Sequence, residues 1–186
     1  GQVATLALVP AVADAVNVPV VAAGGIADGR GMAAALTLGA SGVWIGTRFL
    51  ASREATIHPD YRARILAAPE TASEWYGDLY DGNWPDAPHR ALANATARAW
   101  REAGAAAPGQ RPGEGEAIGL DPGGAAVRRY QSYTPHPETS GDIAAMSLWA
   151  GQGVGLVRDV QPAAEIVREI HEEARRILNA APGLLE

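Results

Sequence analysis

Two short apolar segments, each followed at once by glycine, set the tightest limits on what this chain can fold into. Val18–Ala23 leads into Gly24-Gly25, and Gly42–Ile45 leads into Gly46-Thr47. Both segments are continuously apolar, which is typical of strands covered on two faces in a parallel sheet or barrel. The Ala-rich stretch between them predicts a helix, so the order strand, turn, helix, strand, turn indicates parallel α/β architecture.

The two glycine turns are predicted to share one edge of the sheet and to bind an anion there. Without a Cβ, Gly24, Gly25 and Gly46 let backbone N–H groups approach a phosphate closely, and Thr47 adds a hydroxyl donor. The N-terminus of the following helix, which Asp28 is expected to cap, adds partial positive charge. The alternative is that these glycines only turn the chain tightly.

The kind of phosphate site is narrowed by motifs that the sequence lacks. Neither G-x-G-x-x-G before a helix nor G-x-x-x-x-G-K-[ST] occurs, which excludes the dinucleotide fingerprint and the P-loop. Barrels of the (β/α)8 type commonly bind phosphate with the loops after strands seven and eight. Such a barrel needs about 250 residues, whereas this chain has 186 and begins at Gly1 rather than Met. We therefore expect the C-terminal part of a longer barrel protein.

The composition of the chain limits the kinds of partner that the protein is expected to bind. The net charge of −6 argues against nucleic-acid binding, and the absence of cysteine excludes disulfides and thiolate metal sites. The apolar runs are too short and too interrupted by glycine to span a bilayer, so no membrane partner is expected and a cytoplasmic location is the default.

The rest of the chain is predicted to be mostly helical. Three regions are expected: barrel over 1–52, helices and long loops on the active-site side over 53–161, and a C-terminal helix packed on the barrel over 162–186. Hydrophobic spacing and Pro or Gly boundaries predict individual helices; these cover 10–16, 29–38, 48–51, 54–68, 88–103, 142–149 and 162–178. The Gly- and Pro-rich stretch 104–124 is predicted to have no regular structure.

Few side chains outside the turns indicate chemistry, and no catalytic residue is predicted. The four histidines show no metal-ligand spacing. His58 and His89 are expected to cap helices or pack in loops, and His171 to lie at the surface or pack. His136 lies in a Pro-flanked loop and could approach a substrate, although no acid is paired with it. Glu114 and Glu116 are expected to belong to a charged loop held by Arg111 rather than to act as paired carboxylates. The aromatic residues could cover a flat ring or simply pack together; they are Trp75, Tyr76, Tyr80, Trp84 and Trp149.

Longer stretches resemble the nitronate monooxygenase family, formerly called nitropropane dioxygenases. The resemblance rests on LALVPAVADAVNVPVVAAGGIADGRGMAAALTLGASGVWIGTRFLA, on YDGNWPDAPHRAL with RPGEGEAIG, and on WAGQGVGLVRDVQPAAEIVREIHEEARRIL, which together extend over nearly all of the chain. It implies an FMN-dependent (β/α)8 barrel in which this chain supplies strands seven and eight. It also implies oxidation of alkyl nitronates with O2, through reduced FMN, to a carbonyl compound and nitrite.

The resemblance also implies which residues hold the FMN phosphate. Ala23, Gly24 and Gly25 match the family's A-G-G motif, and its x-x-G-T motif is matched by Trp44, Ile45, Gly46 and Thr47. The family often has Gln or Asp where Trp44 stands, so a backbone contact is expected there. The family's catalytic histidine lies in a Gly-Gly-His-x-Gly segment whose closing glycine would be Gly1. The first barrel strands, which in the family contribute the flavin ring contacts, are missing as well. We therefore expect the isolated 186 residues to bind FMN weakly or not at all and to show no turnover.

Two other functions remain open from the sequence. FMN-dependent enoyl-acyl-carrier-protein reductases share the AGGI and GT elements and use a reduced nicotinamide cofactor, so they are the alternative enzyme reading. The chain could instead be a non-catalytic fragment that binds a phosphate-containing ligand or completes a barrel with another chain.

Overall fold

The computed structural model describes residues 3–184 and divides into two compact units. One unit, here called the terminal unit, contains the chain up to Ala55 together with the residues from Gly151 onward. The other, the middle unit, contains Thr56–Ala150. The predictions that concern Gly1 lie outside the described residues.

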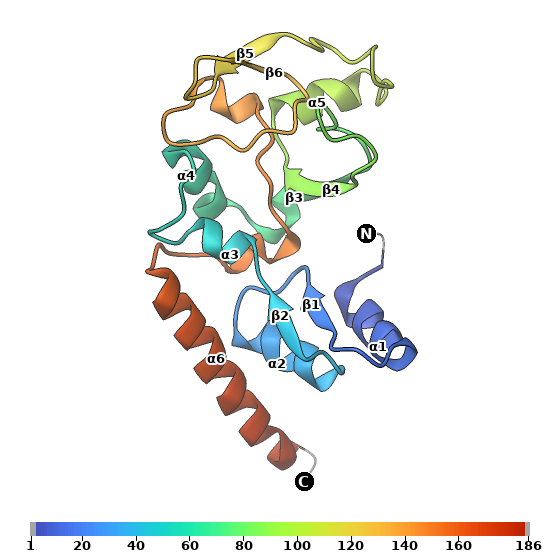
Figure 1. Cartoon of the computed structure of the whole chain (residues 1–186), viewed down its shortest axis with the longest axis vertical. Helices are drawn as coiled ribbons and strands as arrows, with labels where there is room; N and C mark the ends of the chain where they lie inside the picture. The colour runs from blue at the N-terminus through green and yellow to red at the C-terminus, as the bar shows by residue number, and fades with distance from the viewer. Residues whose placement is uncertain (1–2, 185–186) are drawn as a thin grey trace. The chain divides into compact units, whose positions relative to one another are not determined.

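The terminal unit is built on two parallel strands with helices packed against them (Figure 1). Strand β1 pairs with β2 so that Val21 lies opposite Gly42 and Ala23 lies opposite Trp44. The predicted strand–helix–strand order and its α/β class are therefore confirmed. The elements of this unit are α1 (Thr5–Ala15), β1 (Val21–Ala23), α2 (Gly29–Thr37), β2 (Gly42–Trp44), α3 (Thr47–Leu50), the 3-10 helix η3 (Gln152–Leu156), α6 (Ala163–Ala180) and the 3-10 helix η4 (Ala181–Leu184).

Helix α2 connects the two strands and packs against α6. A Cβ on Gly29 would lie only 2.5 Å from the backbone nitrogen of Ala174, so the first turn of α2 touches the α6 backbone directly. Ile166 and Ile170 of α6 are buried beside it. At its other end α2 stops as the sequence predicts, because Gly39 takes a left-handed φ of +97° and donates its N–H to the Leu36 carbonyl.

Helix α1 corrects the sequence prediction. It begins at Thr5 and contains Pro10 in its interior, whereas the sequence suggested a start at Pro10. The Thr5 hydroxyl donates to the Gly24 carbonyl at 2.8 Å, which fixes the helix start at the end of β1. Pro10 cannot donate to the carbonyl of Leu6, and its ring crowds that carbonyl, so the helix continues through a residue that disfavours it.

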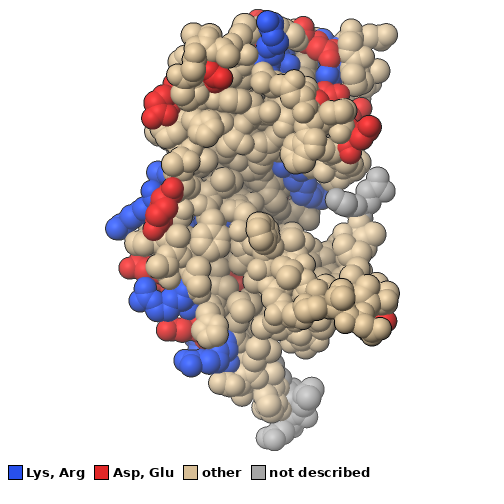
Figure 2. All heavy atoms as spheres, viewed as in Figure 1, with Lys and Arg blue, Asp and Glu red and all other residues tan. Residues whose placement is uncertain are grey.

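Helix α1 and the two strands of the terminal unit leave apolar surface exposed. Leu6 is 69% exposed, Val21 57% and Trp44 74%. Figure 2 shows that the face over α1, β1 and β2 carries almost no charged side chains. Within the described residues, β1 and β2 pair only with each other, so each strand has one free edge. Free strand edges and uncovered apolar faces are features that folded proteins normally cover.

The middle unit contains two small antiparallel sheets, although helices and long loops were predicted for most of this region. Strand β3 pairs with β4, and β5 pairs with both β6 and β7. Aromatic and aliphatic side chains form its cores, with Tyr80 and Leu79 almost fully buried in one of them. The elements are α4 (Pro59–Ala67), the 3-10 helix η1 (Glu70–Ala72), β3 (Ser73–Tyr76), β4 (His89–Leu92), α5 (Ala95–Glu102), β5 (Ala117–Leu120), β6 (Ala126–Arg128), β7 (Ser140–Gly141) and the 3-10 helix η2 (Ile143–Ala145).

The predicted helix over 88–103 is wrong in its first half. Residues His89–Leu92 form β4, and the helix starts only after Asn94, whose side-chain oxygen accepts a hydrogen bond from the Ala97 N–H at 3.0 Å. Asn94 is the stronger start signal because its side chain satisfies an N–H group that the first helical turn leaves unpaired. Pairing with β3 then determines the conformation of the preceding residues.

Two further predictions in the middle unit are corrected by long-range pairing. Part of the stretch predicted to be irregular forms β5, in which a Cβ on Gly119 would lie 2.2 Å from the Ser140 carbonyl oxygen. The helix predicted over 142–149 is reduced to the turn η2. Its later residues run beside β4 instead, where the Leu92 N–H donates to the Leu148 carbonyl at 2.8 Å.

Among the residues that the structure describes, no helix combines the length and apolar character that crossing a bilayer requires.

Candidate phosphate-binding site

The two glycine turns lie at one edge of the parallel sheet, as predicted. Ala23, the last residue of β1, pairs with Trp44, the last residue of β2, so Gly24 and the Ile45–Thr47 segment leave the sheet side by side. Because the strands are parallel, both turns begin at their carboxyl ends. This is the edge at which open α/β sheets and barrels bind their ligands.

The turns present unpaired backbone N–H groups. Gly24, Gly25 and Gly46 are exposed, and none of their N–H groups donates to another described residue. Gly25 adopts a left-handed φ of +73°, which a side chain would disfavour. A Cβ at Gly25 or Gly46 would meet no atom within 4 Å. Together with the exposure of all three glycines, this leaves open space at the turns that a ligand can enter. We call these residues, with Thr47, the glycine cradle.

Thr47 is held in place by a residue from the far end of the sequence. Its Oγ1 accepts the Gly151 N–H at 2.9 Å. A hydroxyl has one donor and two acceptor lone pairs, so this contact leaves the Thr47 proton available. Thr47 can therefore orient its hydroxyl toward an oxyanion while Gly151 holds the oxygen.

A third chain segment, which the sequence interpretation did not include in the site, reaches the glycine cradle. A Cβ on Gly153 would lie 3.3 Å from the carbonyl carbon of Gly25 and 3.2 Å from the Ala27 Cβ. Residues 151–153 thus lie against both glycine turns. The signal in the sequence is the alternating glycines of GQGVG, which allow such close backbone approach.

The N-terminus of α2 does not contribute to an anion site, contrary to the sequence prediction. Its first N–H, from Gly29, donates to Glu173 Oε2 at 2.7 Å. The next two, from Arg30 and Gly31, donate to Asp28 Oδ1 at 3.0 and 3.2 Å. Two carboxylates already satisfy these N–H groups and offset the positive end of the helix dipole.

Cations near the cradle are also committed elsewhere. The Arg30 side chain donates a hydrogen bond to the Asp28 carboxylate. Partial burial raises the pKa of that carboxyl, but this hydrogen bond and one from Gly31 outweigh the burial and hold the pKa below its usual value. Arg48, next to Thr47, is buried and donates to Asp159 Oδ1 at 2.9 Å and to the Gln161 side chain. The cradle thus offers neutral donors.

The remaining predicted site residues lie beside the cradle. Ala23 and Trp44 end their strands and are exposed. Ile45 is half-buried and packs on the core of the terminal unit. The backbones of these three residues lead directly into the glycine turns, and the structure records no side-chain hydrogen bond from Trp44 to another described residue.

The histidines serve capping and packing roles. His58 caps α4, since its Nδ1 accepts the Asp60 N–H at 3.1 Å. His89 packs edge-on against Trp149, with ring centroids 4.8 Å apart. His136 packs against Tyr133, and His171 is exposed on α6. Among the described residues, no cluster of His, Cys, Asp and Glu has the arrangement of a metal site.

The other chemical candidates are structural as well. Arg111 pairs with Glu114, as predicted, while Glu116 pairs with Arg129, so the two carboxylates do not act together. Tyr76, Tyr80 and Trp149 pack in the core of the middle unit. Trp75 and Trp84 are exposed, so the five aromatic residues do not form one wall.

Comparison with known proteins identifies the family. The family model described as nitronate monooxygenase matches residues 1–173, which is most of the chain. The chain belongs to the nitronate monooxygenase family. The resemblance of the glycine turns and of the C-terminal segment is thereby confirmed.

Individual relatives agree with this assignment. Nitronate monooxygenase npaC of Metarhizium robertsii is 40% identical over 191 aligned residues, which cover 95% of this chain and 48% of npaC. The structure of FabK from Thermotoga maritima has a TM-score of 0.71 and 30% identity, covering 99% of this chain and 53% of FabK. Nitroalkane oxidase from Streptomyces ansochromogenes has a TM-score of 0.65 and 26% identity, covering 96% of this chain and 46% of the oxidase. The chain spans about half the length of these nitronate monooxygenase-family relatives.

Proposed function

We propose that the protein is a flavin-dependent oxidoreductase that oxidises alkyl nitronates with O2 to carbonyl compounds and nitrite. In this proposal the glycine cradle holds the phosphate of FMN. The observation that carries it is the set of open, unpaired N–H groups at Gly24, Gly25 and Gly46 beside the Thr47 hydroxyl, in a chain of the nitronate monooxygenase family.

The residues present fit a phosphate group. Phosphate oxygens accept hydrogen bonds from backbone N–H groups, and charge-assisted bonds of this kind are about twice as strong as neutral ones. Ala23, Trp44 and Ile45 are assigned backbone roles at the rim. Because Arg48 and Arg30 are paired with other residues, the proposed binding depends on close approach to the main chain rather than on a positive side chain.

The redox chemistry would come from the isoalloxazine ring of FMN when it is bound. The described residues are assigned the binding of the phosphate end, and the reaction itself is proposed for the whole protein, since the chain spans about half of its relatives. The free edges of β1 and β2 and the exposed Trp44 support the proposal that further strands complete the sheet.

The phosphate assignment is tested by comparing FMN with riboflavin, which has the same ring and no phosphate. Both are titrated into the full-length protein while flavin fluorescence is followed. We expect FMN to bind at least about tenfold more tightly, as several charge-assisted hydrogen bonds imply. Equal affinities for the two flavins would contradict a phosphate role for the cradle.

The reaction is tested on the flavin-loaded full-length protein. We expect nitronate-dependent O2 consumption together with nitrite release. NAD(P)H oxidation with an enoyl thioester, and no response to nitronate, would instead support the enoyl-acyl-carrier-protein reductase alternative. Retention of a phosphate ester without any flavin would support the non-catalytic alternative.

A further inference from the structure

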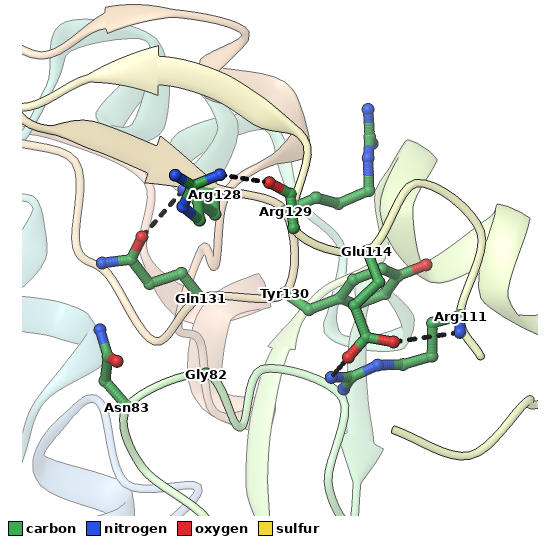
Figure 3. Close-up of a pocket in the computed structure, with 9 residues that line it drawn as sticks. Gly82, Asn83, Arg111, Glu114, Arg128, Arg129, Tyr130 and Gln131 are labelled. Atoms are coloured by element: carbon green, nitrogen blue, oxygen red, sulfur yellow. Dashed lines mark hydrogen bonds and ion pairs between the residues drawn. The ribbon is translucent and has the colours of Figure 1, made fainter. Parts of the chain in front are cut away.

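A cavity in the middle unit lies apart from the glycine turns in sequence and is lined mainly by polar and charged side chains. Its volume is about 210 Å³ (Figure 3). Its wall includes Asn83, Arg128, Tyr130 and Gln131, together with Glu114, whose carboxylate is balanced by its ion pair with Arg111. A single water occupies about 30 Å³ in the liquid, and sites for drug-sized ligands begin at about 300 Å³. The cavity therefore suits a small ligand.

Two residues of the cavity wall have an unusual backbone conformation. Asn83 and Tyr130 adopt left-handed φ angles of 72° and 68°. For a bulky residue such as Tyr130 this conformation is a genuine outlier. Gly82, which precedes Asn83, lies against the backbone of Tyr130 and Gln131, since a Cβ there would be 2.9 Å from the Gln131 Cα. Backbone hydrogen bonds from the Gly82 N–H to Tyr130 and from the Ser132 N–H to Gly82 fix this arrangement.

Two of the three arginines at the cavity are already neutralised. The Arg111 side chain is only 5% exposed, pairs with Asp81 and Glu114, and lies over the Tyr130 ring at 4.5 Å. Its Nε is buried without a partner among the described residues. Arg129 pairs with Glu116 at 2.9 Å.

Arg128 differs from both of them. No carboxylate among the described residues lies within ion-pair distance of it, and its Nη1 donates to the neutral carbonyl of Gly115 at 2.6 Å. Its Nε and Nη2 make no hydrogen bond to another described residue. Arg128 thus brings an unbalanced positive charge and free donors to the cavity.

Two neutral side-chain amides add further hydrogen-bond donors to the cavity. Gln131 Oε1 accepts the backbone N–H of Arg128 at 2.8 Å, which leaves the side-chain NH2 of Gln131 free to donate. The Asn83 side chain makes no hydrogen bond to another described residue, and in Figure 3 its amide lies on the same side of the cavity as that of Gln131. A planar guanidinium matches the acceptor geometry of an oxyanion, and the two amides of the same cavity can add neutral donors.

We propose that this cavity binds a small oxyanion of the phosphate or carboxylate class, with Arg128 as its charged contact and Gln131 and Asn83 as neutral donors. The site is independent of the glycine cradle, since its residues belong to the middle unit. It needs no flavin, so its binding is measured separately from the proposed oxidation.

The test titrates inorganic phosphate into the protein and follows the side-chain NH2 signals of Gln131 and Asn83 by NMR, which localises binding to this cavity. Sodium chloride at the same ionic strength is the reference. We expect saturable shifts with phosphate only, and a Kd raised at least about tenfold in Arg128→Gln, which removes a charge-assisted contact. Arg129→Gln is the matched control, because it removes a neighbouring charge that is already paired, and it should change the Kd by less than about twofold.

A second variant tests the same site without removing an arginine. Gln131→Glu keeps the acceptor for the Arg128 N–H but replaces the free NH2 with negative charge, so phosphate binding should be lost while the amide spectrum of the fold persists, with the Asn83 NH2 as the remaining reporter. Equal losses in Arg128→Gln and Arg129→Gln, equal shifts with chloride, or no saturable shift in the unchanged protein would each overturn the proposal.

Discussion

The hydroxyl of Thr47 accepts the N–H of Gly151 at 2.9 Å, although 104 residues separate the two positions. The turn after β2 is therefore fixed by a segment that returns to the terminal unit after the whole middle unit. Gly153 makes the corresponding approach to Gly25. A third chain segment thus holds the two turns of the cradle, and the geometry of the cradle depends on the fold of the terminal unit rather than on either glycine motif alone.

Replacing Thr47 with valine tests the hydroxyl. The change preserves the shape of the side chain but removes both the acceptor for Gly151 and the donor proposed for phosphate. We expect FMN affinity to fall about tenfold or more, since a hydrogen bond to a charged group contributes about 1.5–3 kcal/mol. Riboflavin affinity should change much less. The measurement is a fluorescence titration of the full-length protein.

The matched control for this change is Thr37→Val. The Thr37 hydroxyl donates to the carbonyl of Ala33 within α2, so it makes no contact with the cradle. FMN affinity should stay within about twofold of the unchanged protein. A comparable loss in both variants would mean that the Thr47 effect is not specific to the site.

Gly25→Ala tests the open space in front of the amides. Alanine at the left-handed φ of +73° costs about 1–2 kcal/mol, and its methyl group would occupy space proposed for phosphate. Gly109→Ala places the same methyl at a φ of +87°, also with no atom within 4 Å, on an exposed loop. Both variants should lose similar stability in urea denaturation, whereas only Gly25→Ala should lose FMN affinity. Unchanged FMN binding in Gly25→Ala would count against the cradle.

The parts of the fold that the sequence predicted correctly depend on local signals. Asp28 caps α2 and Gly39 ends it, and both act through contacts within a few residues. The parts that it missed depend on partners far away in the chain. Residues 89–92 adopt a strand because β3 lies beside them, and residues 142–149 lose their helix to pairing with β4 and β5. Local composition contains no information about such partners.

The candidate site shows the same division. The glycine turns and Thr47 were found from their position after apolar strands, but Gly151 and Gly153 reach them only in the folded structure. The predicted role of the α2 N-terminus failed for the same reason, because Glu173, which satisfies the Gly29 N–H, is supplied by α6. A sequence pattern indicates that N–H groups are present, and only tertiary structure decides whether they are free.

Gly29→Ala tests the contact between α2 and α6. The new Cβ would lie 2.5 Å from the Ala174 nitrogen and 2.7 Å from the Ile170 carbonyl oxygen, so the two helices must separate. We expect a loss of about 1–3 kcal/mol in the free energy of unfolding, as overpacking typically causes. Gly42→Ala, in β2 with no atom within 4 Å, should be neutral or slightly stabilising. Similar urea midpoints for the two variants would contradict this packing.

His89 is expected to make the stability of the protein depend on pH. Burial lowers the pKa of its imidazole, and a hydrogen bond between Nδ1 and the Ala87 carbonyl opposes this only in part. The unfolded chain, with a pKa of about 6.5, then binds more protons than the folded protein. The contribution of neutral His89 is therefore complete above about pH 6.5 and falls as the pH drops below that value.

Thermal unfolding of the unchanged protein should show a lower Tm at about pH 5.5 than at about pH 7.5. In His89→Gln this difference should shrink, although the baseline Tm falls because the contact with Trp149 is lost. The exposed His171→Gln is the control and should keep the difference of the unchanged protein. A pH dependence in His89→Gln as steep as that of the unchanged protein would show that another group is responsible.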